Sequence, residues 1–182
     1  MGNRAVVVFH MKDEESKEEY ISPAVYLHWN GGPESVYAFL DELDRRKVRT
    51  TLSDPSYEFA RFVHVIGDFM DDKVVVSPFS IGDYGAGGLS LGVWGPPEKI
   101  ETEYLKDSQY NQGDNGIYVV TRGGPAGRIV RRWIGYGESF RELPTKEVEK
   151  ERKAAYKHDY MVGKNSIPAT FLKIRPKISS LG

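Results

Sequence analysis

The sequence predicts an α+β domain: an antiparallel, or mixed, β-sheet with two amphipathic helices on one face and a charged C-terminal helix. Three observations support this class. Short runs of β-branched and aromatic residues are bounded by turn residues, two longer segments carry apolar residues at helical spacing, and the chain becomes rich in charge after Pro144. Strands grouped apart from most of the helices are typical of α+β folds.

The length of 182 residues and the 40% apolar content suffice for one packed core. We therefore expect a core domain over residues 1–143 and a charged helix and tail over residues 144–182, packed on the core or extending from it. The 25 basic and 26 acidic side chains nearly balance, so the chain lacks an overall positive field. Any contact with nucleic acid would need a local basic patch.

The chain contains no cysteine, which excludes disulfides, thiolate nucleophiles and zinc sites with cysteine ligands. Its four histidines are not spaced as in metal-binding motifs, so we expect neither a metal nor a cofactor. The apolar run at the start is too short for a signal peptide or a membrane span. We expect a cytoplasmic protein that does not contact membranes.

The first strand is expected at residues 4–11, where three valines precede a phenylalanine. A charged loop over residues 12–19 leads to a second strand at residues 24–29. Pro33 fits the first position of a helix, and the apolar residues that follow lie on one face. These residues are Val36, Phe39, Leu40 and Leu43.

Asp54 and Pro55 predict the start of a second helix, as its N-cap and first helical residue. Its apolar stripe should face the sheet and consists of Phe59, Phe62, Val63, Ile66, Phe69 and Met70. The opposite side should face solvent and carries Tyr57, Arg61, His64 and Asp68.

The second half of the chain predicts a glycine-rich loop over residues 81–88 and strands at residues 89–94, 117–121 and 128–134. The last two of these strands are joined by a turn over residues 123–127 and should pair with each other. Thr145 is expected to cap a charged helix over residues 146–158. Residues 167–182 are expected to form an edge strand or a packed extended tail.

A polar corner is expected where the second strand meets the first helix, at His28, Asn30, Gly31 and Gly32. Backbone N–H groups at a helix N-terminus bind anions, and a nearby histidine can act as an acid or a base. The alternative is a tight structural turn in which Asn30 satisfies backbone amides. The turn is the commoner arrangement, because the lysine and hydroxyl residue of a phosphate-binding loop are missing.

Asp114 and Asn115 form a second polar group before the strand at residues 117–121. Their oxygens suit a hard cation or a sugar, although the spacing of a calcium loop is absent and a plain turn is the alternative. We expect the order of the strands to bring Arg4, His28, Asn30 and this turn together.

A local basic patch with interleaved aromatic residues occurs in the last third of the chain and is a candidate for contact with a macromolecule. Its members are Arg128, Arg131, Arg132, Trp133, Lys150, Lys153 and Lys157. Nearby glutamates dilute the charge, and a solvated helix face is the alternative.

Three phrases of the sequence, M-G-N-R-A-V, Y-L-H-W-N-G-G-P-E-S-V-Y-A-F-L and G-D-N-G-I-Y-V-V, resemble a widespread family of small, mostly uncharacterised proteins of phages and other mobile elements. The phrases extend to about Thr121. The resemblance implies a protein similar in kind to anti-CRISPR proteins, which bind a Cas effector or its guide RNA. No catalytic constellation is recognisable, so we expect an interaction protein rather than an enzyme. The alternatives are a nucleotide- or phosphate-handling enzyme or sensor at the polar corner, and a structural or regulatory accessory protein.

Overall fold

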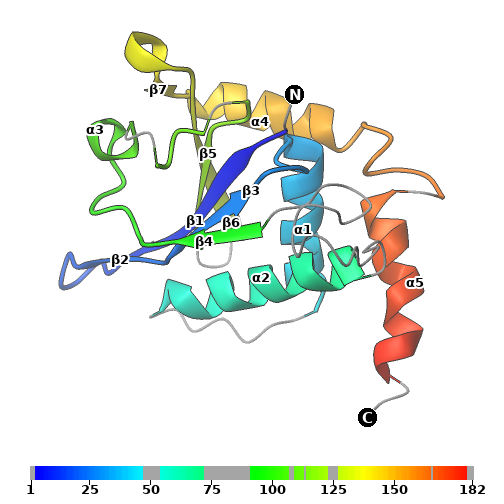
Figure 1. Ribbon diagram of the computed structural model, residues 1–182. Helices are drawn as coiled ribbons and strands as arrows, with labels where there is room; N and C mark the ends of the chain where they lie inside the picture. Colours follow the sequence, from blue (N-terminus) through cyan, green and yellow to red (C-terminus); the bar gives the residue numbers. More distant parts are fainter. Residues whose placement is uncertain are drawn as a thin grey trace, which may run out of the picture.

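The computed structural model describes residues 3–46, 54–71, 91–106, 109–112, 114–122, 127–164 and 166–179. Within them, a seven-stranded sheet has the order β4-β3-β1-β5-β6-β7, with β2 paired to the end of β1 (Figure 1). The strands are β1 (Ala5–Lys12), β2 (Glu19–Ile21), β3 (Ala24–Leu27), β4 (Leu91–Trp94), β5 (Ile117–Arg122), β6 (Arg128–Ile134) and β7 (Arg141–Glu142). The predicted α+β class is confirmed.

The sheet is mixed because β1 and β5 run parallel at its centre, whereas all other neighbouring strands are antiparallel. Val7 of β1 lies opposite Tyr118 of β5. The valines at positions 6–8 are fully buried, since both faces of the central strand are covered. A continuous apolar run is what such a strand requires.

Most of the helices cover one face of the sheet. They are α1 (Pro33–Arg45), α2 (Pro55–Asp71), α4 (Thr145–Ala155) and α5 (Ile167–Ser179). The opposite face carries the short α3 (Thr102–Leu105) and a second apolar cluster that includes Val6, Ile117 and Trp133. In the main cluster, Ala155 and Phe171 of the C-terminal helices pack with residues of α1 and α2. The segment after residue 143 is therefore packed on the core.

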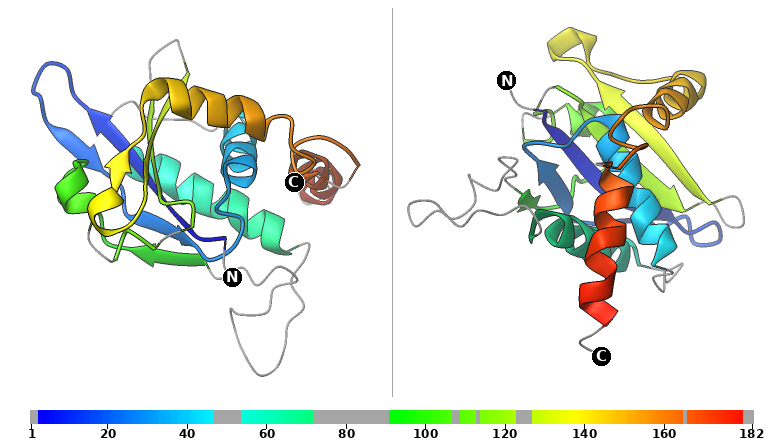
Figure 2. Two further views of the ribbon diagram at one scale, coloured as in Figure 1. Left: turned by 90° about the horizontal axis from the view of Figure 1, so that it is seen from above. Right: turned by 90° about the vertical axis from the view of Figure 1, so that its right-hand side faces the viewer.

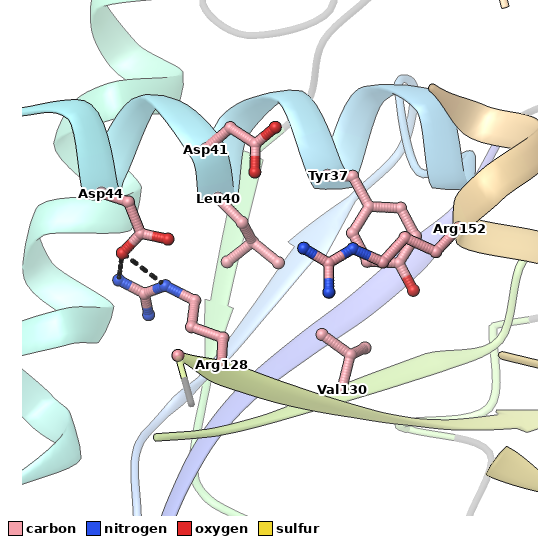
Figure 3. Close-up of a pocket in the computed structure, with 8 residues that line it drawn as sticks. Tyr37, Leu40, Asp41, Asp44, Arg128, Val130 and Arg152 are labelled. Atoms are coloured by element: carbon pink, nitrogen blue, oxygen red, sulfur yellow. Dashed lines mark hydrogen bonds and ion pairs between the residues drawn. The ribbon is translucent and has the colours of Figure 1, made fainter. Parts of the chain in front are cut away.

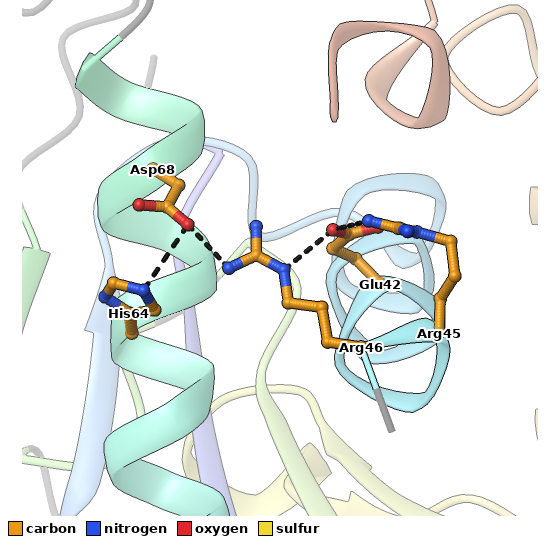
Figure 4. Close-up of polar contacts among 5 residues, drawn as sticks. All are labelled: Glu42, Arg45, Arg46, His64 and Asp68. Carbon is orange, nitrogen blue, oxygen red and sulfur yellow. Dashed lines mark hydrogen bonds and ion pairs between the residues drawn. The ribbon is translucent and has the colours of Figure 1, made fainter. Parts of the chain in front are cut away.

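The two predicted amphipathic helices are present, and α1 begins with Pro33 as expected. At the start of α2, Asp54 accepts a hydrogen bond from the backbone N–H of Ser56 at 2.8 Å. The second helix differs from expectation at Asp68, which faces α1 rather than solvent. Arg46 donates to Asp68 at 2.5 Å and to Glu42 at 2.8 Å, so it ties the two helices together (Figure 4).

The expectation of an edge strand or extended tail at residues 167–182 is wrong, because residues 167–179 form α5. The hydroxyl of Ser166 accepts a hydrogen bond from the N–H of Ala169 at 3.2 Å and so caps the helix. Phe171 is 1% exposed and packs edge-on against Phe39. The N-cap of α4 is Pro144 and not Thr145. The glycine-rich segment 81–88 and most of the turn at residues 123–127 lie outside the described residues.

Candidate functional site

The polar corner predicted from the sequence forms at one end of the sheet. The strands β1 and β5 are parallel, and β3 is antiparallel to β1. The starts of β1 and β5 therefore lie beside the end of β3. The backbone N–H of Asn3 donates to the carbonyl of His28 at 3.2 Å, and that of Gly31 donates to the carbonyl of Asn3 at 2.8 Å. The N–H of Asn115 donates to the carbonyl of Arg4 at 3.0 Å.

Arg4 and Asp114 form a half-exposed ion pair at this corner. Oδ2 of Asp114 accepts from Nε of Arg4 at 3.3 Å and from its backbone N–H at 3.1 Å. Partial burial acts to raise the pKa of Asp114, but the hydrogen bonds and charge of Arg4 outweigh it and lower that pKa. Beside the pair, Nδ1 of His28 lies 2.9 Å from the hydroxyl of Tyr26.

The Gly31-Gly32 turn is shaped by close packing. A Cβ on Gly31 would lie 2.6 Å from both the Cβ and the backbone nitrogen of Ala5, so glycine is required for this approach. The carboxylate of Glu34 lies against Gly32 and so places the chain's own negative charge at the start of α1. Asn30 adopts a positive φ of 56°. These features favour the turn interpretation of the corner over an anion site.

The three arginines of the predicted basic patch are neutralised within the protein. Arg128 pairs with Asp44 and Glu58, and Arg131 pairs through two nitrogens with Glu142. Arg132 is 1% exposed and pairs with Glu151 of α4 at 2.9 Å.

Trp133 has no exposed surface, and its Nε1 donates to the hydroxyl of Thr102 at 3.1 Å. Arg132 and Trp133 therefore offer no surface to a macromolecule, because both faces of β6 are covered at these positions. The prediction that Arg132 and Trp133 contact a macromolecule is therefore corrected, because both side chains are buried. Charge reversal of Arg132 would test folding rather than binding.

The lysines in and just after α4 have a different environment. Lys146, Lys150 and Lys153 of α4 and Lys157 in the turn that follows are all exposed, and we call them the lysine stripe. The spacing of four and three residues places the three lysines of the helix on one side of it, opposite the buried Val148 and Ala155. None is in an ion pair with a carboxylate of the described residues. Figure 2 shows α4 at the edge of the molecule.

A pocket of about 140 Å³ lies between α1, β6 and α4 (Figure 3). It was not predicted from the sequence. α1 lines it with Tyr37, Leu40, Asp41 and Asp44, while β6 contributes Arg128 and Val130 and α4 contributes Arg152. Its sequence signal is the polar spacing Tyr37, Asp41 and Asp44 at i, i+4 and i+7 on α1.

Asp41 and Arg152 are two polar groups of the pocket with capacity for a ligand, and the buried hydroxyl of Tyr37, which also lines it, has no hydrogen-bond partner among the described residues. Burial raises the pKa of Asp41, and the hydroxyl of Tyr156 hydrogen-bonds both of its carboxylate oxygens at 2.7 Å. Burial, together with Asp41, raises the pKa of Tyr156 to about 12. The guanidinium of Arg152 lies 5.6 Å from the ring centroid of Tyr37, and it forms no ion pair with a described carboxylate.

His10, on the face of the sheet that carries α3, is a buried histidine that the polar corner does not include. Its Nδ1 lies 3.3 Å from the hydroxyl of Thr121, and its Nε2 lies 3.8 Å from a carboxylate oxygen of Glu19. Burial lowers the pKa of His10 below its ordinary value of 6.5, against the opposing charge of Glu19. The charges of Arg131 and Lys12 lower it further.

We expect His10 to make the protein less stable in mild acid. As the pH falls below 6.5, the unfolded chain binds a proton before the folded protein does, so the free energy of unfolding decreases. The variant His10→Gln should therefore lose less stability than the parent between about pH 7.5 and about pH 5, measured by urea unfolding. Equal pH dependence in the variant and the parent would contradict the expectation.

The described residues contain no group of three or more histidine, aspartate or glutamate side chains placed to hold a metal ion. In the same part of the chain, no helix has the length and apolar character needed to cross a bilayer. Comparison of the chain with protein-family models, curated proteins and solved structures gives no match. The geometry thus defines an α+β protein with a partly exposed polar corner, an exposed lysine stripe and a polar pocket lined by α1, β6 and α4.

Proposed function

We propose that this is an interaction protein of a mobile element that inhibits a host defence system by binding a Cas effector or its guide RNA. The observation that carries the proposal is the lysine stripe, a row of exposed cations without acidic partners among the described residues. Such a row attracts phosphates or acidic protein surfaces and steers their approach. The resemblance of the first two-thirds of the sequence to proteins of mobile elements supports the choice of partner.

The stripe is presented on a firmly anchored helix. Glu151, on the inner side of α4, pairs with the buried Arg132 at 2.9 Å, and Tyr156 just beyond the helix bonds Asp41 of α1. A charged surface held rigidly loses less conformational entropy on binding than one on a mobile segment. This arrangement favours a role in recognition for α4.

The triple variant Lys150→Glu, Lys153→Glu, Lys157→Glu tests the proposal. Loss and reversal of three contacts should weaken capture of the effector complex by about tenfold or more and should restore interference against a target plasmid in cells. The control reverses Lys106, Lys164 and Lys173, which are also exposed and give the same change in net charge. The proposal fails if the parent protein captures no effector complex at micromolar concentration, or if both triple variants inhibit interference equally well.

A nucleotide- or phosphate-handling role at the polar corner is the alternative proposal. The convergence of Arg4, His28 and Asp114 favours it, whereas Glu34 at the start of α1 opposes it. A thermal-shift screen with nucleotides separates the two roles, since a ligand at 100 times its Kd stabilises a protein by about 2.7 kcal/mol. We expect no shift at this corner. A shift that Arg4→Ala abolishes would establish the alternative.

A further inference from the structure

We propose that the pocket between α1, β6 and α4 binds an unpaired guanine base of single-stranded RNA, while the lysine stripe holds the adjoining phosphates. The inference rests on the proposed function, which names an effector protein or its guide RNA as the partner, and it selects the RNA. It combines two features of the helix α4 and the turn after it, the guanidinium of Arg152 that lines the pocket and the exposed lysines.

The size of the pocket fits the six-membered ring of a base. An apolar cavity of about 150 Å³ takes up benzene, and the pocket here has a volume of about 140 Å³. Because it is partly open, the second ring and the sugar of a purine nucleotide can remain outside. Leu40 and Val130 provide apolar walls (Figure 3).

The polar groups of the pocket match the Watson–Crick edge of guanine. Guanine presents the O6 acceptor next to its N1–H and N2–H donors, and unpaired bases are commonly recognised on this edge. Arg152 only donates and the Asp41 carboxylate only accepts, so together they pair with O6 and with the two donors. The Tyr156 hydroxyl leaves lone pairs of Asp41 available, since each carboxylate oxygen accepts more than one bond.

The other bases fit this pair of groups less well. Adenine and cytosine present an unprotonated ring nitrogen where Asp41 needs a donor, so two acceptors would face each other. Uracil offers one ring N–H and lacks the second donor. Arg128 does not alter this choice, because Asp44 and Glu58 already engage its guanidinium.

Fluorescence anisotropy with labelled single-stranded RNAs of about ten nucleotides tests the inference. The probes are oligouridine strands with one central guanine, adenine or inosine. We expect the guanine strand to bind about tenfold more tightly than the adenine strand, with inosine between them because it lacks the N2 amino group. Equal affinities for guanine and adenine would overturn the proposal.

The variant Asp41→Asn assigns the preference to the pocket. It keeps an acceptor for Tyr156 but removes the second acceptor needed by guanine, so the guanine and adenine strands should bind equally. Asp13→Asn in the turn after β1 makes the same chemical change and should keep the preference. Thermal unfolding of each variant verifies the fold, and Arg152→Lys, which retains the charge but loses the planar fork, should also weaken the preference. Retention of the preference in Asp41→Asn would overturn the assignment.

The results also separate this inference from the proposed function. Absence of binding to every strand, combined with capture of the effector protein by the lysine stripe, overturns the guanine pocket and leaves an acidic protein surface as the partner. Binding to all strands without preference for guanine, but with dependence on the lysine stripe, also overturns the guanine pocket. That result supports contact with RNA through its phosphates alone.

Discussion

Replacing Arg132 with methionine should lower the free energy of unfolding by about 3 kcal/mol, because the change removes one partner of a buried ion pair. The guanidinium of Arg132 pairs with Glu151, donates to the carbonyl of Asn115 at 2.5 Å and lies 3.5 Å from the ring centroid of Tyr118. Methionine fills most of the space of the side chain but satisfies neither acceptor. The 24% exposure of the Glu151 side chain lets some water reach it, which keeps the loss at the lower end of the range for buried pairs.

Urea unfolding measures the loss, with Arg131→Met as the matched control on the same strand. The side chains of Arg131 and Glu142 are 39% and 36% exposed, and an exposed pair of this kind contributes about 1 kcal/mol or less. Adding Glu151→Gln to Arg132→Met should recover part of the stability, since no unpaired charge then remains. Equal losses in the two single variants would show that Arg132 does not anchor α4.

The local elements of this fold could be predicted because their signals lie close together in the sequence. The apolar spacing of α1 and the Asp54-Pro55 start of α2 depend on neighbouring residues alone. The helix α5 was missed because its apolar pattern is interrupted by lysine and arginine, while Phe171 is buried by contacts with two distant helices. Tertiary packing decides such a segment more than helix propensity does.

The candidate sites likewise divide into features set by neighbouring residues and features set by distant contacts. The polar corner could be predicted because turn residues at strand ends gather wherever those ends meet. The pairing of the β6 arginines with carboxylates could not, since Arg128 and Glu58 are separated by 70 residues. The pocket depends on the contact of Tyr156 with Asp41, which spans 115 residues. Sequence alone shows which residues carry charge, but the assembled sheet determines which of those charges remain unpaired.

Gly116→Ala should destabilise the protein by about 3 kcal/mol or more, through overpacking and a left-handed backbone conformation. Gly116 has a φ of +64° at the start of β5, and an added Cβ would collide with the carbonyl oxygen of Trp133 and lie 3.0 Å from its carbonyl carbon. The obstacle is backbone, so relief requires separation of β5 from β6 next to the Ile117–Trp133 pair. The carbonyl of Gly116 also accepts from the N–H of Val6 at 3.0 Å, which places the central strand β1 in the path of any shift.

Gly127→Ala is the control that isolates the collision in this variant. Gly127 has a φ of +86°, but an added Cβ there would meet no atom of the described residues within 4 Å. Its substitution should cost about 1–2 kcal/mol from the left-handed conformation alone. The difference between the two variants in urea unfolding, followed by the fluorescence of tryptophan, therefore measures how closely β5 and β6 approach at this end of the sheet. A difference near zero would mean that the close contact between Gly116 and Trp133 does not exist in solution.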